Sequence, residues 1–321
     1  MNKASKIYIA GHTGLVGSAI LRALENKGYL NILIKSHKDL DLTNQKVTLD
    51  FFKKEKPDYV FLAAAKVGGI KANSFYPADF IYNNLAIQTN IIHSSYLNDV
   101  KRLLFLGSSC IYPKFSDQPI KESYLLSGYL EPTNQAYALS KIAGIEMCAS
   151  YNKQYKTEYL SAMPTNVYGP GDRYDENDSH VIPALIKKFH EAKVKKRSSV
   201  TLWGSGKAFR EFIYCDDLAS ACVFLMDLNR EKFNDLLNLS NNSPIVNIGS
   251  GIDLTIKELA IKISKIVEYS GEIFFDSTMP DGTPKKLLDI TKMNNLGWKT
   301  AIKFDVGLKL TYQSYLRALK G

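Results

Sequence analysis

Short apolar runs alternate with amphipathic segments along the first half of this 321-residue chain. The apolar runs, at residues 7–10, 32–35, 59–63 and 103–107, have the length of buried strands. Between them, residues 18–27, 45–54 and 78–96 space their apolar side chains as a helix does. This βαβ alternation predicts a doubly wound parallel α/β sheet, which a helix over 135–155 and a strand over 159–163 extend.

The net charge does not select one function. Lysine and arginine number 41 against 32 acidic residues, a net charge of +9, which suits nucleic acid, an acidic membrane surface or a small phosphorylated ligand equally well. No window approaches the roughly 18 apolar residues of a membrane span, and the first residues do not form a signal peptide. The four cysteines form no CxxC pair. We therefore expect a cytoplasmic protein with reduced thiols and no metal site.

A GxxGxxG motif, Gly11 to Gly17, follows the first predicted strand directly and opens the first helix. Glycines at this turn let the backbone bend tightly and lie close to a pyrophosphate, which the free N–H groups of the helix N-terminus attract. A tight strand-to-helix turn alone accounts for such a motif as well. Its position one strand into a βαβ unit favours dinucleotide binding.

The end of the second predicted strand distinguishes NAD from NADP in such folds. An acid there holds the ribose 2′-hydroxyl, whereas basic groups hold a 2′-phosphate. Here the segment reads Lys35-Ser36-His37-Lys38, and the first acids, Asp39 and Asp41, come later, where they serve equally well as caps of the next segment. The segment predicts NADP.

Tyr137 and Lys141 form a YxxxK motif, which on a helix places both side chains one turn apart on one face. Because a nearby positive charge favours phenolate, the pair can act as acid or base toward a carbonyl oxygen. A tyrosine that packs beside a solvated lysine is the competing interpretation. Ser108 or Ser109, at the carboxyl end of the fourth predicted strand, offers a hydroxyl to the same carbonyl.

This Ser–Tyr–Lys set behind an N-terminal GxxGxxG resembles the extended short-chain dehydrogenase/reductases that modify nucleotide sugars. Further motifs resemble the GDP-L-fucose synthase family, whose members epimerise C3 and C5 of GDP-4-keto-6-deoxy-mannose and reduce its C4 ketone. These motifs are AAAKVGGI at 63–70, SSCIYP at 108–113, EPTN at 131–134, PTNVYGP at 164–170, SHVIPAL at 179–185, WGSG at 203–206, REF at 210–212 and PDGTP at 280–284. The resemblance covers essentially the whole chain. It implies an NADP-binding Rossmann domain at 1–165 and, mainly, a smaller α/β domain for the nucleotide sugar at 166–321.

The resemblance also implies catalytic roles. Tyr137 is the expected proton donor to the C4 oxygen, Lys141 its activator and Ser108 the hydroxyl on the carbonyl. Cys110 and His180 are the expected acid/base pair at C3 and C5, whose protons the 4-ketone acidifies. A buried structural cysteine and a histidine that caps the helix after it are the competing interpretations. We expect structural roles for Cys148, Cys215, Cys222, His93 and His190.

Two sets of binding residues follow from the same resemblance. The implied cofactor contacts are Gly11, His12, Thr13, Gly14, Leu15, Val16, Gly17, Lys35, Ser36, His37, Ala64, Leu106, Gly107, Ser108, Ser109, Tyr137, Lys141, Pro164, Thr165, Asn166, Val167 and His180. The implied substrate contacts are Lys188, Trp203, Arg210 and Asp281, of which Trp203 and Asp281 also suit core packing and a turn. Two arginines of the family that help to hold the 2′-phosphate are replaced here by Thr13 and His37, which weakens the NADP assignment without reversing it.

Three functions compete. The leading hypothesis is an NADPH-dependent reductase and epimerase of a GDP-4-keto-6-deoxy sugar. A close alternative reduces a GDP-4-keto-heptose and leaves epimerisation to another enzyme, because nothing in the motifs separates a six-carbon from a seven-carbon sugar. A nucleic-acid or regulatory protein on the same fold explains the net charge but not the intact set of site residues, so we expect neither a nucleic-acid nor a membrane partner.

The resemblance implies a homodimer in which helices near 78–96 and 135–155 of two subunits pack as a four-helix bundle. Both segments carry more apolar residues than one buried stripe requires. Packing within one subunit could also absorb them.

Overall fold

A parallel six-stranded sheet forms the centre of the computed structural model, which describes residues 1–175, 179–238, 244–279 and 281–320. The strands lie in the order β2-β1-β3-β4-β5-β9, and all their pairings are parallel. Their bounds are β1 Ile7–Ala10, β2 Ile32–Ile34, β3 Tyr59–Leu62, β4 Arg102–Leu106, β5 Tyr159–Pro164 and β9 Ile245–Ile248. The doubly wound parallel α/β fold predicted from the alternation is confirmed.

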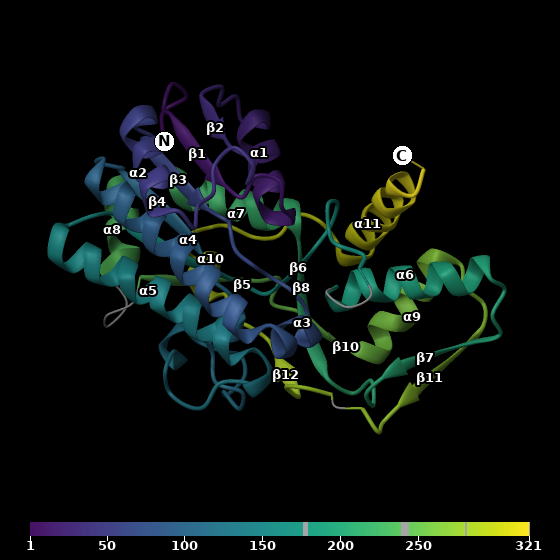
Figure 1. Cartoon of the computed structure of the whole chain (residues 1–321). Coiled ribbons are helices and arrows are strands. Elements are labelled where there is room, and N and C mark those ends of the chain that lie inside the picture. The colour runs from purple at the N-terminus through teal and green to yellow at the C-terminus, as the bar shows by residue number, and fades with distance from the viewer. Residues whose placement is uncertain (176–178, 239–243, 280, 321) are drawn as a thin grey trace.

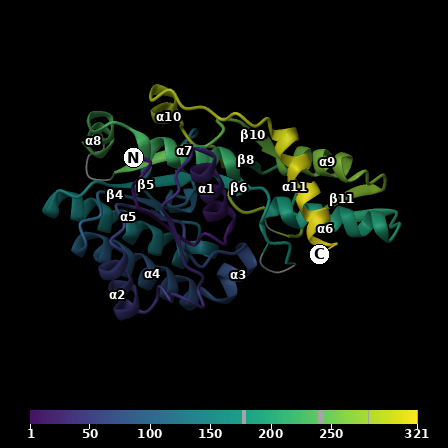
Figure 2. The same ribbon diagram turned by 90° about the horizontal axis from the view of Figure 1, so that it is seen from above.

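Helices cover both faces of this sheet (Figure 2). On one side lie α2 (Gln45–Glu55), α4 (Pro77–Leu97) and α5 (Gln135–Tyr155), and on the other α1 (Leu15–Asn26) and α7 (Cys215–Asp227). Strand β1 shows why, because Ile7 and Ile9 pack into one hydrophobic core while Tyr8 and Ala10 pack into the other. Side chains of a strand alternate between faces, so a strand buried on both faces is apolar throughout.

The helix bounds agree with the predicted ranges except at the start of α1. That helix begins at Leu15, three residues before the predicted position, with Gly14 as its N-cap. This first turn belongs to the glycine motif, although its Leu15 and Val16 pack against the hydrophobic core. No helix in the described ranges is both long and apolar enough to cross a membrane.

Smaller elements gather at the other end of the molecule (Figure 1). Strand β8 (Phe209–Tyr214) pairs with β10 (Asp253–Thr255), β12 (Lys285–Lys286) and β6 (Asn166–Tyr168), and β7 (Ser199–Trp203) pairs with β11 (Glu272–Asp276). Helices α6 (Val181–Val194), α9 (Ile256–Val267) and α11 (Phe304–Ala318) pack around them.

The chain crosses between the two parts more than once. After β8 it returns through α7 and α8 (Arg230–Asn238) to strand β9 of the large sheet, and it then leaves again through β10. One hydrophobic core contains residues of both parts, among them Ile9 of β1, Phe189 of α6 and Leu218 of α7. The domain division at residue 165 stays a prediction.

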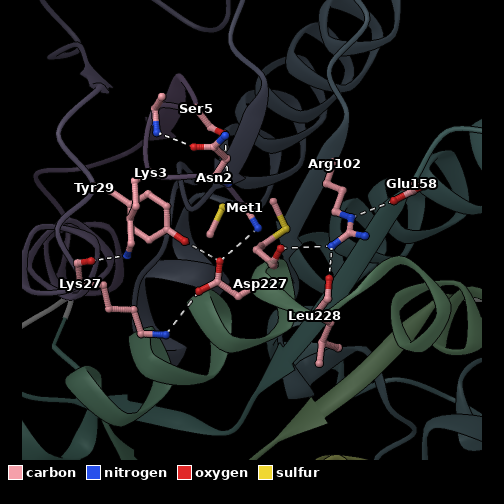
Figure 3. A network of polar contacts seen from close by, with 12 residues as sticks. Met1, Asn2, Lys3, Ser5, Lys27, Tyr29, Arg102, Glu158, Asp227 and Leu228 are labelled. Carbon is pink, nitrogen blue, oxygen red and sulfur yellow. Dashed lines mark hydrogen bonds and ion pairs between the residues drawn. The ribbon is translucent and has the colours of Figure 1, made fainter.

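A polar network ties the returning segment to the sheet (Figure 3). The buried Arg102 donates to Glu158 at 2.8 Å and to the carbonyl oxygens of Met226 and Leu228 at 3.2 and 2.6 Å. The carboxylate of Asp227 accepts a hydrogen bond from the Tyr29 hydroxyl at 2.6 Å and pairs with Lys27 at 3.4 Å. The end of α7 is therefore fixed to β4 and to the segment after α1 by charge-assisted bonds.

Candidate active site

The residues implied as cofactor contacts lie where strands of the large sheet end. Gly11 to Gly17 follow β1, Lys35 to His37 follow β2, Ala64 follows β3, Leu106 to Ser109 close β4, and Pro164 to Val167 span the end of β5 and β6. Because the carboxyl ends of parallel strands meet at one edge of a sheet, these segments lie along one edge, where open α/β sheets bind ligands.

The glycine loop is shaped for close approach. Gly11 has a φ of 86°, and a Cβ there would lie 2.7 Å from the backbone nitrogen of Ala64. A Cβ on Gly17 would clash with the carbonyl oxygen of Gly11. The N-terminus of α1 has no side-chain cap and no acid in its first turn, and Thr13 and Gly14 are exposed. The backbone N–H groups at the start of α1 therefore suit the pyrophosphate of a dinucleotide.

The segment after β2 is mixed in charge. Lys35 is exposed, but the hydroxyl of Ser36 donates to the carboxylate of Asp39 at 2.6 Å, and this bond lowers the pKa of Asp39. His37 is exposed, with its Nδ1 3.9 Å from Asp41. An ionised acid therefore stands beside one of the groups expected to face a 2′-phosphate, which the linear sequence did not reveal.

Ser108, Tyr137 and Lys141 meet at the end of β4. Ser108 caps the short helix η1 (Ser109–Ile111) and forms a hydrogen bond with the Tyr137 hydroxyl. Tyr137 lies in the first turn of α5, and the Nζ of Lys141 donates to the carbonyl oxygen of Leu106 at 2.7 Å and lies 5.9 Å from the centre of the Tyr137 ring. Of the two serines that the sequence offered, Ser108 bonds to the tyrosine, whereas Ser109 is buried in η1.

Burial, more than the neighbouring cation, sets the protonation of this group. Burial raises the pKa of Tyr137, with a smaller contribution from Cys110, and burial lowers the pKa of Lys141 to about 7. The YxxxK spacing predicted that the charge of Lys141 favours the phenolate form of Tyr137. Instead the ammonium is itself desolvated. The tyrosine is held as a neutral phenol, which is the form that can donate a proton.

Cys110 and His180 are linked through a third residue. The Sγ of Cys110 lies 3.5 Å from the Nζ of Lys286 in β12. His180 is the N-cap residue of α6, but its side chain makes no capping bond. Desolvation and the charge of Lys286 lower the pKa of the imidazole. The histidine therefore does not act as a side-chain cap, the competing interpretation of its place in the sequence.

The four implied substrate contacts lie on α6, β7, β8 and the loop before β12. Lys188 donates to the carbonyl oxygen of Thr201 at 2.5 Å, and Trp203 is 64% exposed. Arg210 donates to the carbonyl oxygens of Phe209 at 2.7 Å and Asp281 at 3.4 Å. Burial lowers the pKa of Arg210, although the residue stays cationic.

Asp281 is engaged with the protein. Its carboxylate accepts from the backbone nitrogen of Ser205 at 2.7 Å and from the Ser205 hydroxyl at 2.6 Å. It fastens the loop after Trp203 to the loop before β12. Both carboxylate oxygens of Asp281 are therefore bonded to Ser205, and the residue positions the loop.

Glu211 belongs to the REF motif at 210–212, but its sequence context indicated no role for it. Its side chain is fully buried. Its carboxylate accepts from the backbone nitrogens of Gly251 and Leu288 at 2.7 and 2.9 Å. Its own carbonyl oxygen accepts from the side chains of Thr165 and Asn166 at 3.1 and 2.8 Å. Glu211 thus ties β8 to the segments that carry implied cofactor contacts.

The cysteines and histidines expected to have structural roles are buried or hydrogen-bonded within the protein. Cys148, Cys215 and Cys222 are buried. His93 is hydrogen-bonded to Tyr151 at 2.7 Å and His190 to Tyr312 at 2.9 Å, both through Nδ1. Within the described residues, no group of three His, Cys, Asp or Glu side chains could hold a metal ion.

The chain is similar in sequence and structure to known proteins. The family model described as the NAD dependent epimerase/dehydratase family matches residues 7–249. A putative GDP-L-fucose synthase 2 of Arabidopsis thaliana is 53% identical over 316 residues, 98% of this chain and 93% of the relative. The GDP-L-fucose synthase of Escherichia coli (strain K12) is 51% identical over 314 residues, 97% of this chain and 96% of the relative. Among solved structures, a GDP-mannoheptose C4 reductase from Campylobacter jejuni with NADP bound has a TM-score of 0.88 at 42% identity and covers 98% of this chain and 99% of its own.

Proposed function

This chain belongs to the NAD dependent epimerase/dehydratase family, and we propose that it reduces the C4 ketone of a GDP-4-keto-6-deoxy sugar with NADPH and epimerises C3 and C5, as a GDP-L-fucose synthase does. One observation carries the proposal: Ser108, Tyr137 and Lys141 stand beside Cys110, Lys286 and His180 in a single site. Curated relatives named GDP-L-fucose synthase match almost the full chain at 51–53% identity.

NADP is the cofactor, and when bound it supplies the hydride for C4. The phenol of Tyr137 donates a proton to the C4 oxygen as this oxygen gains charge, and the Ser108 hydroxyl donates a hydrogen bond to the same atom. Lys141, held by the carbonyl oxygen of Leu106, keeps its Nζ beside the tyrosine and within reach of a ribose. Gly11 to Gly17 bind the pyrophosphate with backbone N–H groups.

Epimerisation needs no hydride. Cys110 removes the proton at C3 or C5, because the adjacent 4-ketone accepts the electron pair as an enolate, and His180 gives a proton to the opposite face. Lys188, Trp203 and Arg210 bind the GDP part, since cationic side chains suit a diphosphate and an exposed indole suits a flat base. Asp281 contributes by holding the loop next to Trp203.

The same site also supports a simpler reaction. A C4 reductase of a GDP-4-keto-heptose needs Tyr137, Lys141 and Ser108 but no inversion, and the solved C4 reductase at 42% identity favours this second candidate. One experiment distinguishes these two functions. The purified protein is incubated with NADPH and either GDP-4-keto-6-deoxy-mannose or its heptose counterpart. We expect NADPH oxidation with the six-carbon sugar, whereas oxidation with the heptose alone would favour the second candidate.

We expect the protein to prefer NADPH over NADH by only a small margin. Thr13 and His37 replace two arginines of the family, and Asp39 stands beside Ser36. Each lost charge-assisted hydrogen bond to the 2′-phosphate is worth roughly 1.5–3 kcal/mol. We expect NADPH to have a higher kcat/KM than NADH, and Thr13→Arg to widen the ratio. A higher kcat/KM with NADH in the unmodified chain would contradict the assignment.

We also propose a cytoplasmic homodimer formed through α4 and α5. These helices pack together and still expose large apolar side chains, among them Tyr82 of α4 and Leu139 of α5 at 68% and 42% exposure. A second copy of the same helix pair would cover them. Light scattering in solution is expected to give the mass of two chains, reduced to one by Tyr82→Glu with Leu139→Glu, and the mass of one unmodified chain would contradict the dimer.

A further inference from the structure

Lys286 is aimed at Cys110 by the pairing of two short strands. In the parallel pairing of β12 with β8, Lys286 lies opposite Arg210 and Lys285 lies opposite Phe209. Because successive residues of a strand point to opposite sides, Lys286 and Arg210 share the side that faces Cys110. Lys285 lies on the other side, where its Nζ pairs with Asp253 at 3.2 Å.

In the part of the chain that the structure describes, the groups that face Cys110 come from three elements. Tyr137 of α5 is electrostatically coupled to it, as is Arg210 of β8, while the Nζ of Lys286 in β12 lies 3.5 Å from Sγ. Arg210 is already bonded to two carbonyl oxygens. Among the described residues no carboxylate pairs with Lys286, so its charge is directed at the sulfur.

We propose that Lys286 is a positioning residue for the C3 and C5 epimerisation, because its ammonium pairs with the thiolate form of Cys110 and makes this sulfur the base. The inference rests on the proposed function. A thiolate, and not a thiol, is the reactive form of cysteine, and a lysine in contact with it is one of the arrangements that stabilises it. Burial and, to a smaller extent, the same charge lower the pKa of His180, so Lys286 acts on both members of the pair.

The proton transfers balance. The S–H bond of Cys110 forms as the C–H bond at C3 or C5 breaks, and the electron pair of this bond moves into an enolate with its charge on the C4 oxygen. The imidazolium of His180 then gives a proton to the opposite face and becomes neutral imidazole. Exchange with water returns the thiol to thiolate and the imidazole to imidazolium, and Lys286 stays protonated throughout.

The test compares Lys286→Met with the unmodified chain in two measurements. The first is deuterium uptake at C3 and C5 of GDP-4-keto-6-deoxy-mannose in deuterated water without NADPH. We expect a loss of up to about 30-fold at pH 7, larger than any loss of reduction, because a cysteine with the free pKa of about 8.5 is only about 3% thiolate at that pH. The loss should shrink near pH 9, where a free cysteine, with a pKa of about 8.5, ionises without help.

The second measurement is the rate at which iodoacetamide alkylates Cys110 at pH 7, followed on its peptide by mass spectrometry. We expect this rate to fall with Lys286→Met and to recover partly with Lys286→Arg, which keeps the charge. Lys285→Met is the matched control, because it removes a lysine from the same strand on the opposite side, and it is expected to change neither measurement.

The outcomes separate the inference from the proposed function. An unchanged alkylation rate in Lys286→Met, or a loss of deuterium uptake that is the same from pH 7 to pH 9, would overturn the inference. A raised KM for reduction with normal deuterium uptake would assign Lys286 to substrate binding and overturn it as well. Absence of deuterium uptake in the unmodified chain would instead contradict the proposed epimerisation.

Discussion

Tyr137→Phe is expected to slow reduction of the C4 ketone by about 10²–10⁴-fold while leaving cofactor binding nearly intact. The variant removes only the hydroxyl that is bonded to Ser108, and the ring still packs edge to face on Phe80. Without the phenol, the C4 oxygen must take its proton from water as the hydride arrives. Single-turnover oxidation of NADPH measures the rate, and fluorescence titration with NADPH measures binding.

A second tyrosine on the same helix provides the control for this variant. Tyr151 of α5 bonds to His93, away from the Ser108 cluster, so Tyr151→Phe is expected to reduce substrate at the rate of the unmodified chain. Near-normal turnover in Tyr137→Phe would remove the central assignment. Equal loss in both variants would point to disturbance of the helix.

Cys110→Ser is expected to suppress deuterium uptake at C3 and C5 by at least about 10²-fold, because a hydroxyl is a far poorer base than a thiol at neutral pH. Reduction of a ketone that is already epimerised should be largely retained. His180→Asn should also slow the exchange, since it removes the second proton donor. Proton NMR of the recovered sugar without NADPH measures the uptake at each carbon.

The matched control is the buried Cys148 of α5, whose thiol lies beside the hydroxyl of Ser161 in β5. Cys148→Ala should exchange deuterium at the normal rate per folded molecule. If Cys110→Ser lost reduction and exchange together, the two activities would not be separable at this residue. The proposed division of labour between Tyr137 and Cys110 would then be wrong.

The sequence predicted the first five strands of the large sheet because their signals are local, whereas β9, to which the chain returns after α8, was not predicted. Each strand of the first half is a buried apolar run, each helix repeats its apolar residues every three to four positions, and the glycine motif lies between the first two elements. The same locality brought the Ser108 segment, Tyr137 and Lys141 to attention. The structure adds that Ser108, not Ser109, bonds to the tyrosine.

What the sequence missed depends on pairing between distant segments. Lys286 lies 176 residues after Cys110, and only the alignment of β12 with β8 brings the two together. Its one signal was its place two residues after the PDGTP motif. The role of Glu211 likewise appears only when two backbone nitrogens far along the chain converge on its carboxylate. The spacing of the YxxxK motif likewise reveals the lysine near Tyr137 but not the burial of both groups, which raises the pKa of Tyr137 and lowers that of Lys141.

Product analysis tests the central claim most directly. The unmodified chain is incubated in deuterated water with GDP-4-keto-6-deoxy-mannose, first alone and then with NADPH. We predict deuterium at C3 and C5 before NADPH is added, and GDP-L-fucose labelled at the same two carbons afterwards. NADPH oxidation that yields a C4-reduced sugar with neither carbon labelled nor inverted would contradict the epimerase assignment and leave a simple C4 reductase.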